Sequence, residues 1–241
     1  MNHEPPPDKS SYSSILSMSY FYTGIFLITG FILFSIIISF SNDKAFYKGQ
    51  LLMDIDEQSV LYISIIHHPY LDYLMKLVSE YGREIFWIFV ILTCFVFGGF
   101  QGRMISIVIV LSLLIVIPLN ILVKEVSDRD RPAVKFSTVL SEVQEDKSYP
   151  SGHASVVAVG ITAFALFLKN TKRNLMIFSG LLLEGLLVFV SRIYFGVHYP
   201  TDVIGGIILG SGVTVLISSF HSIYFRFVYK IFNKFSKEKD L

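Results

Sequence analysis

Long apolar runs, separated by polar segments, dominate this sequence. Residues 20–40 contain no charged side chain, and about 20 consecutive apolar residues are enough for a helix to cross the hydrocarbon core of a membrane. Arg103 is the only charged residue between positions 85 and 123, and the glycines beside it predict a tight turn between two spans. The apolar runs predict six transmembrane helices, at about residues 20–40, 84–100, 104–123, 151–168, 175–191 and 201–224.

Two polar segments between the spans are too long to be simple turns. Within residues 41–83, apolar side chains recur with the spacing of one helix face, which indicates an amphipathic helix after the first span. These side chains are Leu71, Leu74, Met75, Leu77, Val78 and Tyr81. Residues 124–150 hold a dense group of charges instead. We expect one domain over residues 20–225, between a loose tail at 1–19 and a basic tail at 226–241.

The composition supports a membrane protein and excludes several other classes. Hydrophobic residues make up 53% of the chain, charged residues only 16%, and the mean hydropathy is +0.60, whereas soluble domains contain about 25% charged residues. A formal net charge of +1 provides no overall basic field for nucleic acid. A single cysteine, Cys94, excludes an intramolecular disulfide. We therefore expect an all-α polytopic membrane protein surrounded by the lipid bilayer.

The distribution of basic residues indicates an orientation. With six spans both termini lie on one side, and a cytoplasmic N-terminus places the Arg103 turn, the loop at 169–174 and the lysine-rich C-terminus inside. These segments are mostly basic, in agreement with the positive-inside rule. We expect a bacterial or archaeal plasma membrane, with the C-terminus in the cytoplasm and the opposite face outside.

Four span ends that carry polar residues converge on this outer face. The third span ends at Lys124, and the fourth begins in the Pro-Ser-Gly-His segment 150–153. The fifth ends at Arg192, and the sixth begins in the His-Tyr-Pro-Thr-Asp segment 198–202. Because neighbouring spans are antiparallel, all four ends lie at the same side of the membrane, whichever way the chain is inserted. The sequence predicts one polar patch built from distant parts of the chain.

Three cations are predicted at this patch. Lys124 and Arg131 are seven residues apart, so on a continuous helix they would share one face, and Arg192 comes from another span. Positive charges around one point suit a phosphoryl group, and arginine adds a bidentate geometry. Taken singly, each of these residues also fits an alternative role, in which a basic side chain at a span end extends to the membrane interface without binding a ligand.

Ser151, Gly152 and His153 begin a predicted helix at the same patch. Ser151 can cap the helix, Gly152 lets a ligand approach the backbone, and the N–H groups at a helix start attract anions. His153 could donate a proton to a group held there. The same residues also fit an ordinary helix start with a satisfied polar side chain at the interface.

His198 and Asp202 are four residues apart at the start of the sixth span. An Asp that bonds one ring nitrogen fixes the tautomer, so the other nitrogen can act as a base or a nucleophile. Metal binding is the rival interpretation, but two histidines and one Asp among three cations form a poor ligand set. We therefore expect no metal and no cofactor. Glu184 is the only charge inside a span, and the pattern assigns it no role.

Together these residues resemble a known family. Residues 124–132 read K-x6-R-P, 150–153 read P-S-G-H, and 191–202 read S-R-x5-H-x3-D. In this order they are similar to the three signature motifs of the type 2 phosphatidic acid phosphatase (PAP2) superfamily, which also includes vanadium haloperoxidases and glucose-6-phosphatase. The motifs cover about a third of the chain, and the six-span pattern extends the resemblance over most of it.

The resemblance implies a role for each candidate residue. His198, oriented by Asp202, would attack phosphorus to form a phosphohistidine, and His153 would protonate the leaving oxygen. Members of the family need no metal, because cations act where Mg²⁺ acts elsewhere. The phosphate would be bound by Lys124, Arg131, Ser151, Gly152 and Arg192.

The resemblance favours a membrane phosphatase whose partner is a membrane lipid, with undecaprenyl diphosphate, phosphatidylglycerophosphate and phosphatidate as candidate substrates. One alternative is a phosphotransferase that passes the phosphoryl group to a lipid or sugar acceptor. Another is a non-catalytic transporter or phospholipid-binding protein, which would have no need of both His153 and the His198–Asp202 pair.

Overall fold

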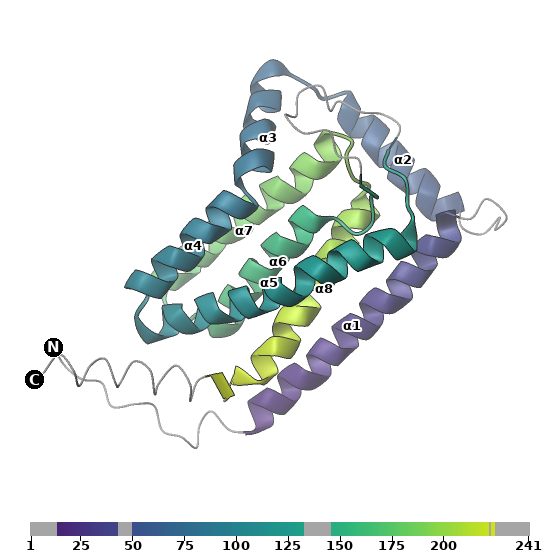
Figure 1. Ribbon diagram of the computed structural model, residues 1–241. Coiled ribbons are helices and arrows are strands. Elements are labelled where there is room, and N and C mark those ends of the chain that lie inside the picture. Colours follow the sequence, from purple (N-terminus) through teal and green to yellow (C-terminus); the bar gives the residue numbers. More distant parts are fainter. Residues whose placement is uncertain (1–13, 43–49, 133–145, 222, 225–241) are drawn as a thin grey trace, which may run out of the picture.

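The structure, a computed structural model, describes residues 14–42, 50–132, 146–221 and 223–224. Within these ranges the chain forms eight α-helices and no strand, which confirms the predicted all-α class (Figure 1). The helices are α1 (Ser14–Asn42), α2 (Gln50–Ser64), α3 (Pro69–Tyr81), α4 (Glu84–Phe97), α5 (Gly99–Ser127), α6 (Gly152–Phe167), α7 (Lys172–Tyr194) and α8 (Pro200–Ser219).

Six of these helices lie where the apolar runs predict spans. Among the described residues, α1, α5, α7 and α8 are long and apolar enough to cross a membrane. The helices α4 and α6 are apolar but shorter, with 14 and 16 residues. The polytopic helical architecture is therefore confirmed, with four full-length candidate spans and two shorter apolar helices.

The boundaries differ from the prediction at several points. α1 begins at Ser14, inside the segment expected to be a loose tail. α5 continues past Lys124 to Ser127, and Pro118 lies within it. α8 ends at Ser219, before the predicted end of its span. The expected basic tail, 226–241, lies outside the described residues.

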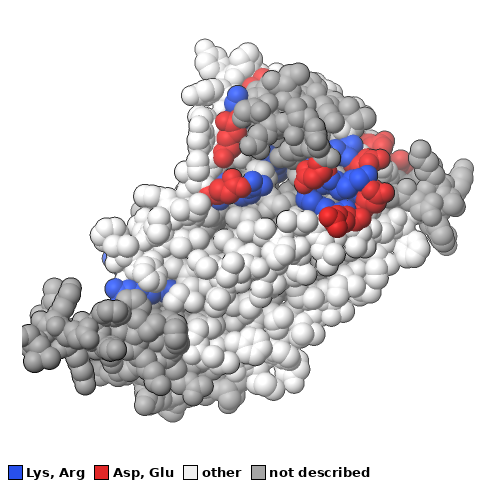
Figure 2. Space-filling view, viewed as in Figure 1, with Lys and Arg blue, Asp and Glu red and all other residues white. Residues whose placement is uncertain are grey.

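Large apolar side chains cover the long flanks of the bundle. Phe26 of α1, Phe89 of α4 and Leu114 of α5 are 75%, 66% and 67% exposed. Most of the charged side chains visible in Figure 2 gather at one end of the molecule, and the long flank below them is uncharged. An apolar surface of this extent indicates a partner other than water, and the helices that carry it are span-like in composition. The chain is an integral membrane protein.

The helix α6 lies at the centre of the bundle, where it packs against α5, α7 and α8, and α1 runs along α8. Small residues allow α6 and α8 to come close. A Cβ added at Gly206 would lie 2.5 Å from the carbonyl oxygen of Ser151, and Gly210 faces the carbonyl of Ser155 in the same way. This contact fixes the start of α6 against the start of α8.

The segment after α1 forms two helices, α2 and α3, which lie across one end of the bundle (Figure 1). The predicted amphipathic face belongs to α3, where Met75 is buried against Tyr194, Phe195 and Val197. The helix α2 contributes Asp56, which is 0% exposed although it is an acid. Both helices contact α7, so they cover the end of the bundle at which the predicted patch lies.

Candidate active site

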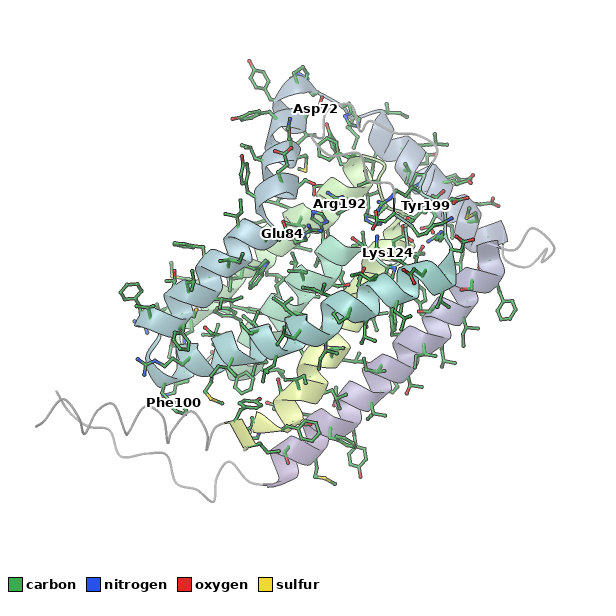
Figure 3. All side chains as sticks on the ribbon, in the orientation of Figure 1. Asp72, Glu84, Phe100, Lys124, Arg192 and Tyr199 are labelled. Atoms are coloured by element: carbon green, nitrogen blue, oxygen red, sulfur yellow. The ribbon has the colours of Figure 1, made fainter. Side chains whose placement is uncertain are left out.

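The ends of α5 and α7 and the starts of α6 and α8 meet beside a cavity of about 560 Å³. Five of the predicted site residues line this cavity: Lys124, Arg131, Gly152, His153 and His198. The other three are at most 1% exposed and are not among the described residues that line the cavity: Ser151, Arg192 and Asp202. Figure 3 shows Lys124, Arg192 and Tyr199 at this end of the molecule, on separate elements.

His198 lies in the turn between α7 and α8 and is 1% exposed. Its Nδ1 is 3.5 Å from Asp202 Oδ2, and its Nε2 is 3.3 Å from Arg131 Nη1. Since arginine can only donate, this contact places a lone pair on Nε2 and the ring proton on Nδ1, towards Asp202. Burial lowers the pKa of His198 to about 3, against the hydrogen bond with Asp202, and the charge of Arg131 adds to the shift. The imidazole is neutral at physiological pH.

Asp202 is held in place by several donors. In the capping box that begins α8, the backbone N–H of Tyr199 donates to Oδ2 over 2.8 Å. The hydroxyl of Ser148 donates to the same oxygen, and Arg129 Nη1 donates to Oδ1 over 2.6 Å. The carboxylate is 0% exposed, so these contacts determine how it faces His198.

Arg129 connects Asp202 to α2. Its Nη2 donates to Asp56 Oδ2 over 2.7 Å and its Nη1 to Thr201 Oγ1 over 2.7 Å, while its guanidinium lies 4.3 Å from the centre of the Tyr199 ring. Burial alone would lower the pKa of Arg129, but the two carboxylates raise it. No sequence pattern marks Arg129 or Asp56, because both lie in the polar segments between the spans, 124–150 and 41–83. Only the identity of their partners shows that they belong to the site.

Lys124 and Arg131 reach the cavity differently from the prediction. α5 ends at Ser127 and the next residue, Asp128, has a φ of 45°, so Arg131 lies in a loop and not on the same helix face as Lys124. The Asp146 carboxylate brings the two cations together, because it accepts hydrogen bonds from Lys124 Nζ and, over 2.6 Å, from Arg131 Nη2. Burial alone would raise the pKa of Asp146, but these two cations lower it.

Ser151 and Gly152 form the start of α6. The Ser151 hydroxyl caps the helix by accepting from the N–H of Ala154 over 3.4 Å. The N–H of Ser151 donates to the Asp202 carbonyl oxygen over 3.0 Å. Gly152 lines the cavity, and a Cβ there would lie 3.6 Å from Asn120 Oδ1. Further residues of the first turn of α6, His153 and Ser155, also line the cavity.

His153 and Arg192 meet residues from the junction of α3 and α4. Arg192 Nη1 donates to the hydroxyl of Ser79 in α3. Arg83, which precedes α4, places its Nη1 3.2 Å from His153 Nδ1 and also pairs with Glu84. Arg83 lines the cavity, although it belongs to none of the three motifs and no spacing in the sequence connects it with His153.

The cavity continues from these polar residues into an apolar arm between α4 and α5. The arm is lined by Trp87, Ile88 and Ile91 from α4 and by Leu113, Val116, Ile117 and Ile121 from α5. Ile88 and Ile117 are 56% and 50% exposed, so the arm reaches the apolar flank of the bundle. The arm results from the pairing of two helices, which the sequence pattern does not specify.

Glu184 packs beneath the junction of α3 and α4, where a Cβ added at Gly82 would lie 3.0 Å from its Oε1. Both carboxylate oxygens are buried and have no hydrogen-bond partner among the described residues. No role follows from this position. Within the described ranges, no three His, Cys, Asp or Glu side chains lie close enough together to hold a metal ion.

Residues 104–226, about half of the chain, match the family model described as the PAP2 superfamily. The chain belongs to the PAP2 superfamily. The matched region contains all three PAP2 motifs, the helices α6 to α8 and α5 from Met104 onwards.

Two relatives and one solved structure are similar to large parts of this chain. The undecaprenyl-diphosphatase of Sulfolobus acidocaldarius is 40% identical over 145 residues, which are 59% of this chain and 67% of that protein. Undecaprenyl-diphosphatase BcrC of Bacillus subtilis is 32% identical over 67% of this chain and 77% of its own. The crystal structure of a transmembrane PAP2-type phosphatidylglycerolphosphate phosphatase from Bacillus subtilis matches with a TM-score of 0.64 and 24% identity, over 83% of this chain and 96% of that one. The similarity to this crystal structure shows a shared fold.

Proposed function

We propose that this PAP2 protein is a membrane phosphatase that hydrolyses a lipid phosphate or lipid diphosphate. The observation that carries the proposal is the shape of the cavity, whose polar end at His198 and Lys124 continues into an apolar arm at the lipid-facing flank. An anionic headgroup can bind at the polar end while its tail stays in the arm. Two of the relatives are undecaprenyl-diphosphatases, which supports this chemistry.

In the proposed mechanism His198 is the nucleophile. Its Nε2 lone pair attacks phosphorus, and the Nε2–P bond forms as the P–O bond to the lipid breaks. The ring becomes positively charged in this step, and the buried Asp202 carboxylate beside Nδ1 stabilises that charge. A neutral ring at the start is required, and burial of His198 provides it.

Cations and backbone groups bind the phosphoryl oxygens. Lys124 and Arg131 already hold a carboxylate, that of Asp146, whose side chain is 57% exposed. A phosphoryl group can take the place of this carboxylate and gain bidentate hydrogen bonds from Arg131. Arg192 adds a third charge, and the start of α6 supplies the backbone N–H groups of Gly152 and His153, while the N–H of Ser151 is bonded to the Asp202 carbonyl oxygen. These donors neutralise the charge of the transition state.

His153 completes the proton transfers. In its protonated form it donates a proton to the lipid oxygen as that oxygen leaves, and the neutral ring then accepts a proton from the water that attacks the phosphohistidine. The second step breaks the Nε2–P bond, releases inorganic phosphate and restores neutral His198. We also propose that this site faces the outer side of the membrane. Arg103 near the start of α5, Lys169 after the end of α6 and Lys172 at the start of α7 lie away from the site, and basic residues in short loops favour the cytoplasmic side.

Phosphate release by the detergent-purified protein tests the proposal. We expect release from undecaprenyl diphosphate, phosphatidylglycerophosphate or phosphatidate, with and without EDTA, and a loss on the order of 10³-fold or more in His198→Ala. Unchanged turnover in that variant would remove His198 as the nucleophile. A strict requirement for a metal would contradict the cation mechanism, and transfer to an added alcohol in place of water would identify a phosphotransferase.

A further inference from the structure

Arg83 is a cavity residue outside the three motifs. It lies at the junction of α3 and α4, and its side chain is 29% exposed. One guanidinium nitrogen, Nη1, is 3.2 Å from His153 Nδ1, and the other, Nη2, pairs with Glu84. Because the Glu84 side chain is 59% exposed, this pair is well solvated, and an anion in the cavity can share the guanidinium.

The position of Arg83 relates it to one part of a substrate. In the proposed mechanism His198 attacks from one side and His153 protonates the leaving oxygen on the other. The group bonded to that oxygen therefore lies next to His153, where Arg83 is. From there the lining of the cavity continues along α4 through Trp87 and Ile88 into the apolar arm. The part of the substrate between its reacting phosphorus and its tail therefore lies beside Arg83.

We propose that Arg83 binds the phosphate that stays on the lipid, and that the substrate class is consequently a lipid diphosphate. This inference rests on the proposed function. In a diphosphate the leaving oxygen bridges two phosphorus atoms, so the retained phosphate gains negative charge as the bond breaks. A guanidinium at this point stabilises that charge. In a simple phosphate monoester the same point holds an uncharged carbon, so there is no retained phosphate at that point for the cation to bind.

The charges around the site agree with two phosphates. Lys124 and Arg131 are joined by Asp146, and they belong to the end of the cavity beside His198. Arg83 belongs to the end beside His153. The cavity therefore has a cation at each side of the position expected for the leaving oxygen.

Binding of small anions tests the inference without turnover. The probes are methylenediphosphonate, which has two linked phosphonates, and orthophosphate, measured by calorimetry on the purified full chain. We expect Arg83→Ala to lose about 10- to 100-fold in affinity for methylenediphosphonate and less than about threefold for orthophosphate. Arg83→Lys should lose less than Arg83→Ala. The matched control is Arg103→Ala, which removes the same charge at the start of α5 and should change neither affinity.

An Arg83→Ala protein with an unchanged preference for methylenediphosphonate would overturn the inference. An equal loss for both anions would overturn it too, because that result assigns Arg83 a general role through His153. Thermal unfolding of each variant shows whether it is folded. If Arg83→Ala does not fold, Arg83→Gln takes its place in the comparison.

Kinetics separate this inference from the proposed function. With farnesyl diphosphate and a short-chain phosphatidate as substrates, Arg83→Ala should lower kcat/KM by about 10- to 100-fold for the diphosphate alone. A wild-type protein that hydrolyses neither these nor the lipids named above would contradict the proposed function, and the anion comparison would still decide the role of Arg83. A wild-type preference for phosphatidate would overturn the inference and leave the phosphatase proposal intact.

Discussion

At the scale of single residues, the site depends on a histidine that is kept neutral. His198 is 1% exposed, and burial lowers its pKa to about 3 from 6.5. The adjacent Asp202 accepts from Tyr199, Ser148 and Arg129, so its position does not depend on His198. The ring can thus form a bond to phosphorus through Nε2 while Nδ1 stays against the carboxylate.

This shift in pKa makes the stability of the protein depend on pH. Between pH 6.5 and 3 the unfolded chain binds a proton at His198 that the folded chain excludes, so His198 makes folding less favourable as the pH falls through this range. The slope is at most about 1.4 kcal/mol per pH unit. Thermal-unfolding midpoints from pH 7.5 to 4.5 should therefore fall more steeply for wild type than for His198→Asn. Parallel curves would contradict the neutral, buried state of His198.

Arg129 is the second residue on which the site depends, because it lies between two buried carboxylates. Asp56 and Asp202 are both 0% exposed, and Arg129 is 2% exposed. Removal of one member of such a group leaves the others charged and unpaired in a medium of low polarity.

Arg129→Leu should accordingly be destabilised by about 3–5 kcal/mol and should lose most of its activity, because Asp202 loses a donor. Thermal unfolding in detergent and phosphate release measure the two effects. Lys147→Ala is the matched control, since Lys147 is a more exposed cation of the same region that pairs with Asp128 and Asp130. We expect little change there. An Arg129→Leu protein as stable as Lys147→Ala would show that the buried network contributes nothing.

At the scale of elements, the contact between α6 and α8 determines where the motifs meet. The first motif ends in the loop after α5, the second begins α6, and the third joins α7 to α8. Gly206 allows the start of α6 to lie directly against α8. The hydrogen bond from the Ser151 N–H to the Asp202 carbonyl then connects the second motif to the third.

Two glycine substitutions should differ in their effect on stability. A Cβ at Gly206 would lie 2.5 Å from the Ser151 carbonyl oxygen, whereas a Cβ at Gly180 of α7 would meet nothing within 4 Å. Gly206→Ala should be destabilised by about 1–3 kcal/mol through overpacking and should lose activity. Gly180→Ala should be neutral or slightly more stable, because alanine favours the helix. Unfolding midpoints of both variants decide the matter, and equal effects would be evidence against close α6–α8 contact.

At the scale of the whole molecule, charged residues are concentrated at one end of an apolar bundle, as Figure 2 shows. The helices α2 and α3 cover this end, and both the cavity and the network around Asp202 lie there. The opposite end carries Arg103, Lys169, Lys172 and Arg173. This asymmetry supports the proposed orientation, with the site outside.

Labelling of single cysteines in intact cells tests the orientation. In a Cys94→Ala background, Gln58→Cys places a thiol on exposed α2, and Lys172→Cys places one at the exposed start of α7. A membrane-impermeant maleimide should modify Gln58→Cys in whole cells and Lys172→Cys only after permeabilisation. The reverse pattern would invert the proposed topology.

The sequence by itself determined the membrane class, the approximate spans and the three motifs. Apolar runs and missing charges are local properties of the chain, and the motif residues lie at span ends that antiparallel packing brings to one side. The tertiary structure decided the rest: the place of Arg131 in a loop, the Asp56–Arg129–Asp202 network, the bridging Asp146, the arm between α4 and α5, and Arg83 beside His153. Each of these depends on contacts between residues far apart in the chain. Asp56 and Arg83 have ordinary positions in the sequence, and only the helices packed against them give those positions a chemical meaning.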